Sequence, residues 1–335
     1  MAPPKSRQFK LERVLSSASP LKRPIHLILD WDGTLTTRDT LEQLGKLPRA
    51  KDARLQAASP DSSVAPNSTK TTWADLVEAY MIDYRKHEAI HVTKSSNPQD
   101  LIHKLRSLQS VEYASVKRTQ DAKFFHMVTT EDVVTVIRNA LESGDLQLRS
   151  GWDALFQLFL PSGPHLPTWR TSKISIVSVN WSETFIRWSL FLACKRLSCL
   201  DDTQKQRLGD MINDMRIHAN EIHGLNSPQG SSGRLIGNLR TSMDKLRAME
   251  GIVASSETSL DDKPIVAYVG DSSTDYECLC AADIGVWISD VPESEVGANF
   301  EKVFRPLKQE TMDFGWAPDL ATVAQDLRAL SQEDV

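Results

Sequence analysis

The sequence has few cysteines, little excess charge and no long apolar run, and each shortage excludes a class of protein. Four cysteines in 335 residues, none in a C-x-x-C pair, are too few for a disulfide framework. A net charge of −5 argues against broad binding of nucleic acid or of anionic lipid. The densest apolar run, Trp188–Cys194, is much shorter than the about 18 residues of a membrane helix. We therefore expect a cytoplasmic protein with reduced thiols and with no nucleic-acid or membrane partner.

Three polar segments interrupt the chain. Residues 1–23 are basic and lack the apolar centre of a secretory signal, which predicts a disordered arm, with a mitochondrial targeting segment as the alternative. Residues 48–72 are rich in Ala, Ser, Pro, Asp and Asn and predict a mobile loop. The third segment, Asn226–Gly233, has the composition of a turn.

Three short apolar runs predict buried strands, namely Pro24–Leu29, Lys173–Val179 and Pro264–Val269. Each run ends in polar residues, and helical patterns lie between the runs. This order is typical of a doubly wound, Rossmann-like α/β sheet of parallel strands.

The stretch between the first two predicted strands has a different pattern. Trp73–Tyr84 and Glu131–Leu141 look helical, and no convincing strand accompanies them. We therefore interpret 37–145 as a helical cap inserted into an α/β core made of 24–36 and 146–335. Aromatic residues of this cap are expected to form its own core, with a substrate pocket as the alternative; they are Trp73, Tyr80 and Tyr84.

The residues that follow the predicted strands carry most of the chemistry. Asp30 and Asp32 follow the first strand, and Gly33 allows the chain to turn close to a ligand. Asp271 and Asp275 follow the third strand, four residues apart. Since the carboxyl ends of parallel strands meet at one edge of the sheet, these carboxylates should gather there and need a cation. Hard oxygen ligands indicate Mg²⁺.

A hydroxyl and a cation complete this predicted site. Ser178 stands at the end of the second strand, and Lys245 lies near the start of a predicted helix, where it would balance an anionic substrate. Arg240 and Lys263 are rival cations, but Lys263 is too close to the third strand for a helix to intervene.

Together these segments resemble the four motifs of the haloacid dehalogenase (HAD) superfamily. The match consists of an apolar strand before Asp-Trp-Asp-Gly-Thr, a strand ending at Ser178, the helical Lys245, and a strand before Gly-Asp-Ser-Ser-Thr-Asp. It extends from residue 24 to about 290, with Arg149–Trp152 ahead of the second strand. The inserted helices resemble the C1 cap of the phosphoserine phosphatase-like branch, and the whole chain is similar to fungal HAD-like hydrolases.

The resemblance implies a role for each motif residue. Asp30 is the implied nucleophile, and Asp32 is the implied general acid and base. Phosphate contacts are implied for Ser178, Lys245, Gly33 and Asn180. Mg²⁺ is implied to bind Asp30, the backbone carbonyl of Asp32 and Asp271. Asp275 is implied to be associated with the metal as a second layer, with capping of the next helix or orientation of Lys245 as the alternatives.

The implied activity is a Mg²⁺-dependent phosphatase that acts on a small phosphorylated metabolite through an aspartyl phosphate. A phosphotransferase or phosphomutase would use the same residues, and a non-catalytic binding protein is the alternative from another class. The substrate and the oligomeric state stay open. His87–His91 matches the H-E-x-x-H zinc motif, yet its apolar neighbours suit ordinary helix packing, so we expect no zinc site there.

Overall fold

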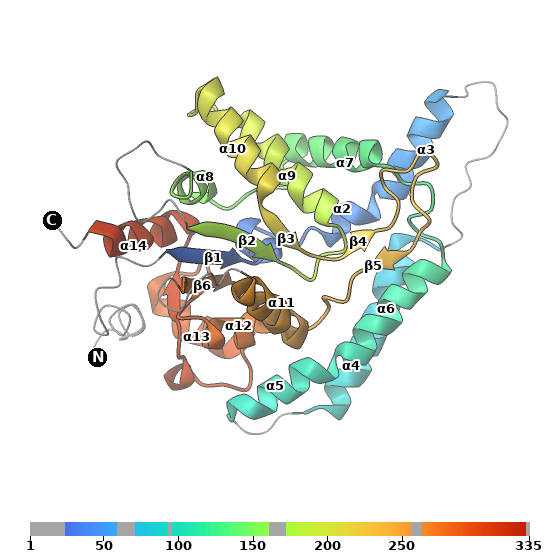
Figure 1. Ribbon diagram of the computed structural model, residues 1–335. Coiled ribbons are helices and arrows are strands. Elements are labelled where there is room, and N and C mark those ends of the chain that lie inside the picture. The colour runs from blue at the N-terminus through green and yellow to red at the C-terminus, as the bar shows by residue number, and fades with distance from the viewer. Residues whose placement is uncertain (1–23, 59–70, 93–95, 161–171, 256–262, 333–335) are drawn as a thin grey trace.

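A parallel sheet of six strands forms the centre of the computed structural model, which describes residues 24–58, 71–92, 96–160, 172–255 and 263–332 (Figure 1). The strands lie in the order β3-β2-β1-β6-β7-β8, and every neighbouring pair is parallel. Their bounds are β1 Ile25–Leu29, β2 Lys173–Val177, β3 Arg216–His218, β6 Ile265–Gly270, β7 Ile284–Ile288 and β8 Gly315–Ala317. The predicted strands are confirmed as β1, β2 and β6, the three at the middle of the sheet.

Helices cover both faces of this sheet, which explains why β1 is buried along its whole length. Leu27 and Leu29 face a cluster built from one set of helices, whereas Ile28 faces a second cluster on the other side. The first set is α8 Trp152–Gln157, α9 Glu183–Arg196, α10 Asp202–Asp214 and α14 Leu320–Gln332. The second set is α11 Ser242–Ala254, α12 Tyr276–Ala281 and α13 Val296–Val303. The predicted doubly wound α/β class is therefore confirmed.

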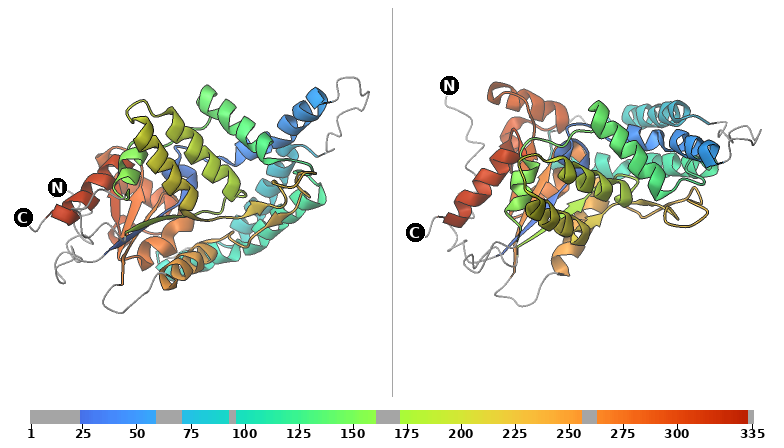
Figure 2. Two further views of the ribbon diagram at one scale, coloured as in Figure 1. Left: turned by 45° about the horizontal axis from the view of Figure 1, so that its top comes forward. Right: turned by 90° about the horizontal axis from the view of Figure 1, so that it is seen from above.

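The described residues between β1 and β2 form a helical module at the carboxyl end of β1 (Figure 2). Its helices are α2 Leu41–Gly45, α3 Leu47–Ala58, α4 Trp73–Ile90, α5 Pro98–Ser107, α6 Gln109–Asp121 and α7 Thr130–Ser143. Capping boxes at Thr72 and Thr129 satisfy backbone donors at the starts of α4 and α7. Trp73 is half-buried, with its ring centroid 5.7 Å from that of Phe124 in the module and 6.1 Å from that of Trp181, which follows β2.

The mobile loop expected at 48–72 is wrong for its first part, because residues up to 58 belong to helix α3. Ala, Arg, Lys and Gln dominate this segment and favour a helix, and Pro48 falls in the first turn, where proline is tolerated. Tertiary contact adds to this preference, since Arg54 pairs with Asp132 of α7 at 2.8 Å. Residues 59–70, like the basic arm at 1–23, lie outside the described residues.

A second chain segment joins the helical module, which corrects the expected assignment of all of 146–335 to the core. The hairpin β4 Glu221–Ile222 and β5 Leu235–Ile236 lies against α6 and the residues after it. Met127 N donates to Ser231 O at 2.8 Å, and Leu235 N donates to the Gln120 side chain at 3.1 Å. These contacts join residues more than 100 positions apart, so helical periodicity within 37–145 gave no sign of them.

Helix α5 fixes the module to the core. Leu101 and Leu105 belong to the same apolar cluster as Met249 of α11. Arg106 forms an ion pair with the buried Glu277 of α12, which also accepts a hydrogen bond from Ser242 at 2.7 Å.

No helix of the described residues is both long and apolar enough to cross a membrane.

Candidate active site

The turn after β1 presents the first two carboxylates. Asp30 continues the sheet, since its N–H donates to Val269 O at 2.9 Å, and only 3% of Asp30 is exposed. Within the turn Trp31–Leu35, Asp32 and Gly33 have non-helical backbone φ and ψ angles. This irregular backbone directs Asp30 and Asp32 apart, as expected from their spacing.

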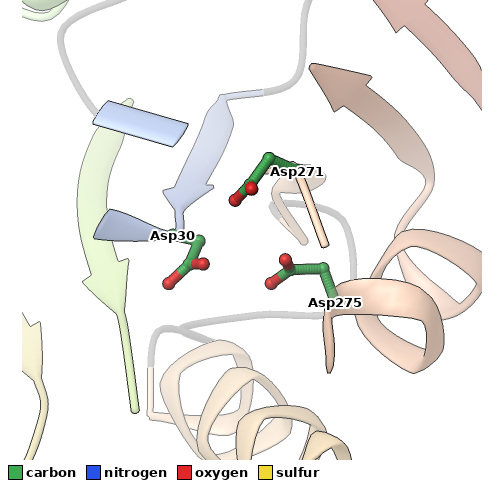
Figure 3. Close-up of side chains that lie close together, drawn as sticks. All are labelled: Asp30, Asp271 and Asp275. Atoms are coloured by element: carbon green, nitrogen blue, oxygen red, sulfur yellow. The ribbon is translucent and has the colours of Figure 1, made fainter. Parts of the chain in front are cut away.

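Three carboxylates from two strand ends converge beside this turn (Figure 3). One carboxylate oxygen from each of Asp30, Asp271 and Asp275 lies within 4.8 Å of the others. Asp271 is oriented by Thr34, whose hydroxyl donates to Oδ1 at 2.9 Å. The predicted gathering of acidic groups at this sheet edge is present in the structure.

Lys245 is the cation at this cluster. Its Nζ lies 2.8 Å from Asp30 Oδ2 and 2.8 Å from Asp275 Oδ1, and its side chain is fully buried. Asp275 also accepts from Tyr268 Oη at 2.7 Å and from Ser272, so both of its oxygens are engaged. Asp275 therefore orients Lys245 and caps the following turn, which are the two alternatives that the sequence left open. The rival Arg240 instead stacks on Tyr113.

The buried charges in this cluster are unbalanced. Burial, followed by the nearby Asp275 and Asp271 carboxylates, raises the pKa of Asp30 well above its usual value, although Lys245 opposes the shift. Burial and Asp275 raise the pKa of Asp271 to about 7. The Asp275 and Asp30 charges raise the pKa of Lys245 despite its burial, which keeps it cationic. One lysine beside these acids leaves an excess of negative charge that a bound cation would offset.

The donor set fits a hard divalent cation. Asp30 Oδ1 is buried and has no hydrogen-bond partner among the described residues, so it is an available ligand atom. Asp271 Oδ2 lies against Gly33, whose lack of a Cβ leaves room for it. Carboxylate oxygens of this kind suit Mg²⁺. Asp275 is less suited to direct ligation because Lys245, Tyr268 and Ser272 occupy its oxygens.

Asp32 is held by a separate hydrogen-bond network. Its Oδ1 accepts from Thr40 N at 2.7 Å and from Thr40 Oγ1 at 2.6 Å, and its Oδ2 accepts from Asn180 Nδ2 at 2.9 Å. Trp31 Nε1 donates to Thr40 Oγ1 at 3.0 Å and anchors that hydroxyl. Burial raises the pKa of Asp32 to about 6, and the Thr40 and Asn180 hydrogen bonds limit the rise.

This network corrects the role expected for Asn180. Its Nδ2 serves Asp32 and Thr40, and its Oδ1 accepts from Ser182 N at 3.1 Å, so both ends of the amide are engaged. The side chain therefore positions Asp32 instead of contacting phosphate. Ser178, by contrast, lies fully buried at the end of β2, where its Oγ accepts from Asn180 N at 3.1 Å and retains its own proton for another acceptor.

Sequence reasoning missed two residues that support the turn. Thr40 was not singled out, since no motif carries it and only folding brings it to Asp32. Arg149 fell within the segment likened to the family, but no role was given to it. Its Nη2 donates to Gly33 O and its Nε donates to Thr34 O at 3.1 Å. Arg149 thus fixes the carbonyls of the turn that carries Asp32.

The H-E-x-x-H segment is engaged in helix packing. His87 is buried with Nε2 2.7 Å from Ser107 Oγ, and its ring stacks on His91 with centroids 4.2 Å apart. Glu88 pairs with Lys104 at 2.9 Å. These contacts place the segment in the packing of α4 against α5, and the absence of a zinc site stays a prediction.

Gly33→Ala should impair both folding and activity. An added Cβ would lie 2.2 Å from Asp271 Oδ2, and the φ of +74° disfavours any side chain. We expect a loss of about 1–3 kcal/mol in the free energy of unfolding, measured in urea. We also expect a higher Mg²⁺ concentration to be needed for half-maximal activity. Gly251→Ala is the matched control: it lies in α11 with open space around it, so alanine should stabilise by about 0.5–1 kcal/mol. Equal behaviour of the two variants would contradict the close approach of Gly33 to Asp271.

Comparison with known proteins gives distant relatives. No family model matches the chain. A CTO1 family protein of Schizosaccharomyces pombe is 26% identical over 288 residues, which cover 82% of this chain and 86% of the relative. The bifunctional TH2 protein, mitochondrial, of Arabidopsis thaliana is 23% identical over 321 residues. That match covers 89% of this chain and 47% of the plant protein, so the chain spans about half the length of that relative.

Similar solved structures include a substrate-bound phosphoserine phosphatase, with a TM-score of 0.43 and 14% sequence identity. That match covers 91% of this chain and 98% of the phosphatase chain. A HAD family hydrolase from Salmonella enterica has a TM-score of 0.44 and 11% identity, and the match covers 97% of this chain and 79% of that one. The chain resembles the haloacid dehalogenase-like hydrolases in its motifs and in its parallel sheet, as the sequence predicted.

Proposed function

We propose that the chain is a Mg²⁺-dependent phosphatase that hydrolyses a small phosphorylated metabolite through a phosphoryl group carried on Asp30. The observation that carries this proposal is the buried Asp30 carboxylate, which has one oxygen paired with Lys245 and the other without a partner among the described residues. A buried carboxylate in this state is suited to nucleophilic attack.

The first step transfers the phosphoryl group to the protein. One oxygen of the Asp30 carboxylate attacks phosphorus and forms an O–P bond, the other being left for the metal, while the bond from phosphorus to the leaving oxygen breaks. Asp32 donates a proton to that oxygen, which departs as an alcohol. The raised pKa of Asp32, about 6, is near the value that suits a general acid at neutral pH.

The second step releases phosphate. Asp32, now a carboxylate held by Thr40 and Asn180, accepts a proton from a water molecule. That water attacks phosphorus, the Asp30–phosphorus bond breaks, and Asp30 returns to its carboxylate form. One residue performs both proton transfers because the leaving oxygen and the attacking water take the same position in turn.

Cationic and polar groups of the chain hold the phosphoryl oxygens. Lys245 is fixed by Asp275 and needs no reorganisation during the reaction, which is the condition under which electrostatic stabilisation is most effective. We assign Ser178 Oγ and the backbone near Gly33 as further contacts. Asp30, the Asp32 carbonyl and Asp271 would hold Mg²⁺, which supplies charge neutralisation for the phosphate.

Removal of divalent metal should abolish phosphate release. EDTA should reduce turnover to background, Mg²⁺ should restore it, and Zn²⁺ should not, because Zn²⁺ prefers tetrahedral nitrogen and sulfur ligands over these carboxylate oxygens. The measurement is free phosphate released from p-nitrophenyl phosphate and from a panel of phosphorylated metabolites. The double variant His87→Ala, His91→Ala should keep this activity. If this variant lost both a bound zinc ion and turnover, the H-E-x-x-H segment would be a functional zinc site.

The same panel separates the alternatives. Added alcohol acceptors would reveal a phosphotransferase by the appearance of a phosphorylated acceptor in place of free phosphate. A non-catalytic binding protein would bind a metabolite and release nothing. We favour a small substrate because the helical module lies at the sheet edge that carries Asp30, where it restricts access. A cytoplasmic location stays a prediction.

A further inference from the structure

A cationic hollow of about 370 Å³ lies between α6 and residues 234–240, which include β5 and lead to α11. Three basic side chains line it, Lys117, Arg234 and Arg240, and none of its lining residues is acidic. Tyr113 and Ile236 supply an apolar wall. On a chain with a net charge of −5, a concave patch of one positive sign is a specific feature of the surface.

Arg240 is the residue that gives this hollow its chemistry. Its guanidinium carbon lies 4.6 Å from the centroid of the Tyr113 ring, and Nη2 donates to Gly237 O at 3.1 Å. Its Nε and Nη1 are buried and have no hydrogen-bond partner among the described residues. Buried charged donors without an acceptor are costly, so their presence indicates an acceptor that the chain itself does not provide.

The acids near Arg240 are engaged elsewhere. Glu112 accepts from Tyr80 Oη at 2.8 Å. Asp244 Oδ2 accepts from the backbone N–H groups of Arg240 and Thr241 at 3.1 and 3.0 Å. Neither carboxylate is hydrogen-bonded to the guanidinium, so its free donors remain available to an external anion. Among the other basic residues of the hollow, Lys117 is paired with Asp121.

A continuous set of hydrogen bonds connects this segment to the candidate active site. Asn220 binds the backbone of Leu239, the residue before Arg240, through Oδ1 and Nδ2 at 3.1 and 2.7 Å. Asn220 N donates to Asn180 O at 3.1 Å, and Asn180 holds Asp32. Arg240 also directly precedes the helix that carries Lys245. The hollow and the catalytic carboxylates therefore share one rigid support.

We propose that this hollow binds a carboxylate or phosphate group through Arg240, with Arg234 adding positive charge. The anion is either the far end of the leaving group of a substrate whose phosphate lies at Asp30, or a separate small anion that modulates the site. The first source rests on the proposed function, whereas binding itself does not.

Malonate is a suitable probe because it carries carboxylates and no phosphate. It should raise the melting temperature of the wild type but not that of Arg240→Gln. The control is Arg247→Gln, which makes the same change in charge at an exposed position of α11 and should keep the malonate effect. Arg234→Gln, at an exposed position, should weaken malonate binding several-fold and serves if Arg240→Gln does not fold. No malonate effect on the wild type, or an equal effect on Arg240→Gln and Arg247→Gln, would overturn the proposal.

Kinetics distinguish the two sources. If the hollow receives the leaving group, Arg240→Gln should lower kcat/KM for phosphoserine or phosphoglycolate, relative to p-nitrophenyl phosphate, by about tenfold or more, mainly through KM, as expected for one charge-assisted pair. If a separate anion binds, malonate should change wild-type turnover of p-nitrophenyl phosphate, and Arg240→Gln should lose that response. A wild type without any turnover would refute the proposed function, and the malonate shift would still decide whether the hollow is a site.

Discussion

Asp30→Asn should abolish phosphate release while the protein stays folded. An amide is a far weaker nucleophile than a carboxylate and a poorer Mg²⁺ ligand, so both functions fail together. We expect kcat to fall by about four orders of magnitude or more, as when other nucleophiles are removed. Lys245 keeps its pairing with Asp275 in this variant, so the cluster retains a compensated charge. Turnover of p-nitrophenyl phosphate and circular dichroism provide the two readouts.

Asp214→Asn is the matched control for Asp30→Asn. It makes the same chemical change at an exposed aspartate at the end of α10, outside the candidate active site. It should retain turnover within a few-fold of the wild type. Full activity in Asp30→Asn would refute the mechanism, and equal losses in both variants would attribute the effect to the loss of a negative charge and not to the nucleophile.

Lys245→Met should cost both activity and stability. Lys245 is fully buried between two carboxylates, and its removal leaves Asp30 and Asp275 without their cation. Breaking a buried ion pair by removing one partner costs about 3–5 kcal/mol in the free energy of unfolding. The deficit should be smaller at acidic pH: burial raises the pKa of the Asp30 carboxyl, so the folded variant is favoured where that carboxyl is protonated and loses stability as the pH rises.

Urea unfolding at several pH values measures this deficit. Lys308→Met removes an exposed lysine paired with Glu301 and should change the stability little. Adding Asp275→Asn to Lys245→Met should restore part of the stability without restoring turnover. A Lys245→Met protein as stable as Lys308→Met at neutral pH would show that the buried acids are neutral and that the cluster carries no excess charge.

Local pattern was enough to predict the centre of the fold. The strands β1, β2 and β6 are apolar at most buried positions and end at polar residues, and both properties can be read from adjacent letters. The buried polar exceptions His26 and Ser175 are paired with each other at 2.9 Å. Because these strands are neighbours in the sheet, their ends bring Asp30, Ser178 and Asp271 to one edge. The strands β7 and β8 both include glycine, and β8 has only three residues, so their pattern was too weak to identify them.

Features that depend on distant contacts were not accessible from the pattern. The hairpin β4–β5 has two residues in each strand, and backbone hydrogen bonds to the residues after α6 hold it. Asn180 was expected to contact phosphate because it follows β2, whereas its amide is taken up by Asp32 and Ser182. Helix α3 was mistaken for a loop because its residues are mostly alanine and charged residues. Such a composition is compatible with a solvent-exposed helix as well as with a loop.

Transfer of a phosphoryl group to Asp30 is the central claim, and mass spectrometry of the acid-quenched protein tests it most directly. The wild type is mixed with Mg²⁺ and a substrate from the panel, quenched during turnover, and digested. We predict one added phosphoryl group on the peptide that contains Asp30, and none on that peptide from Asp30→Asn. A wild type that turns over substrate with that peptide unmodified and the phosphoryl group on another residue would contradict the account.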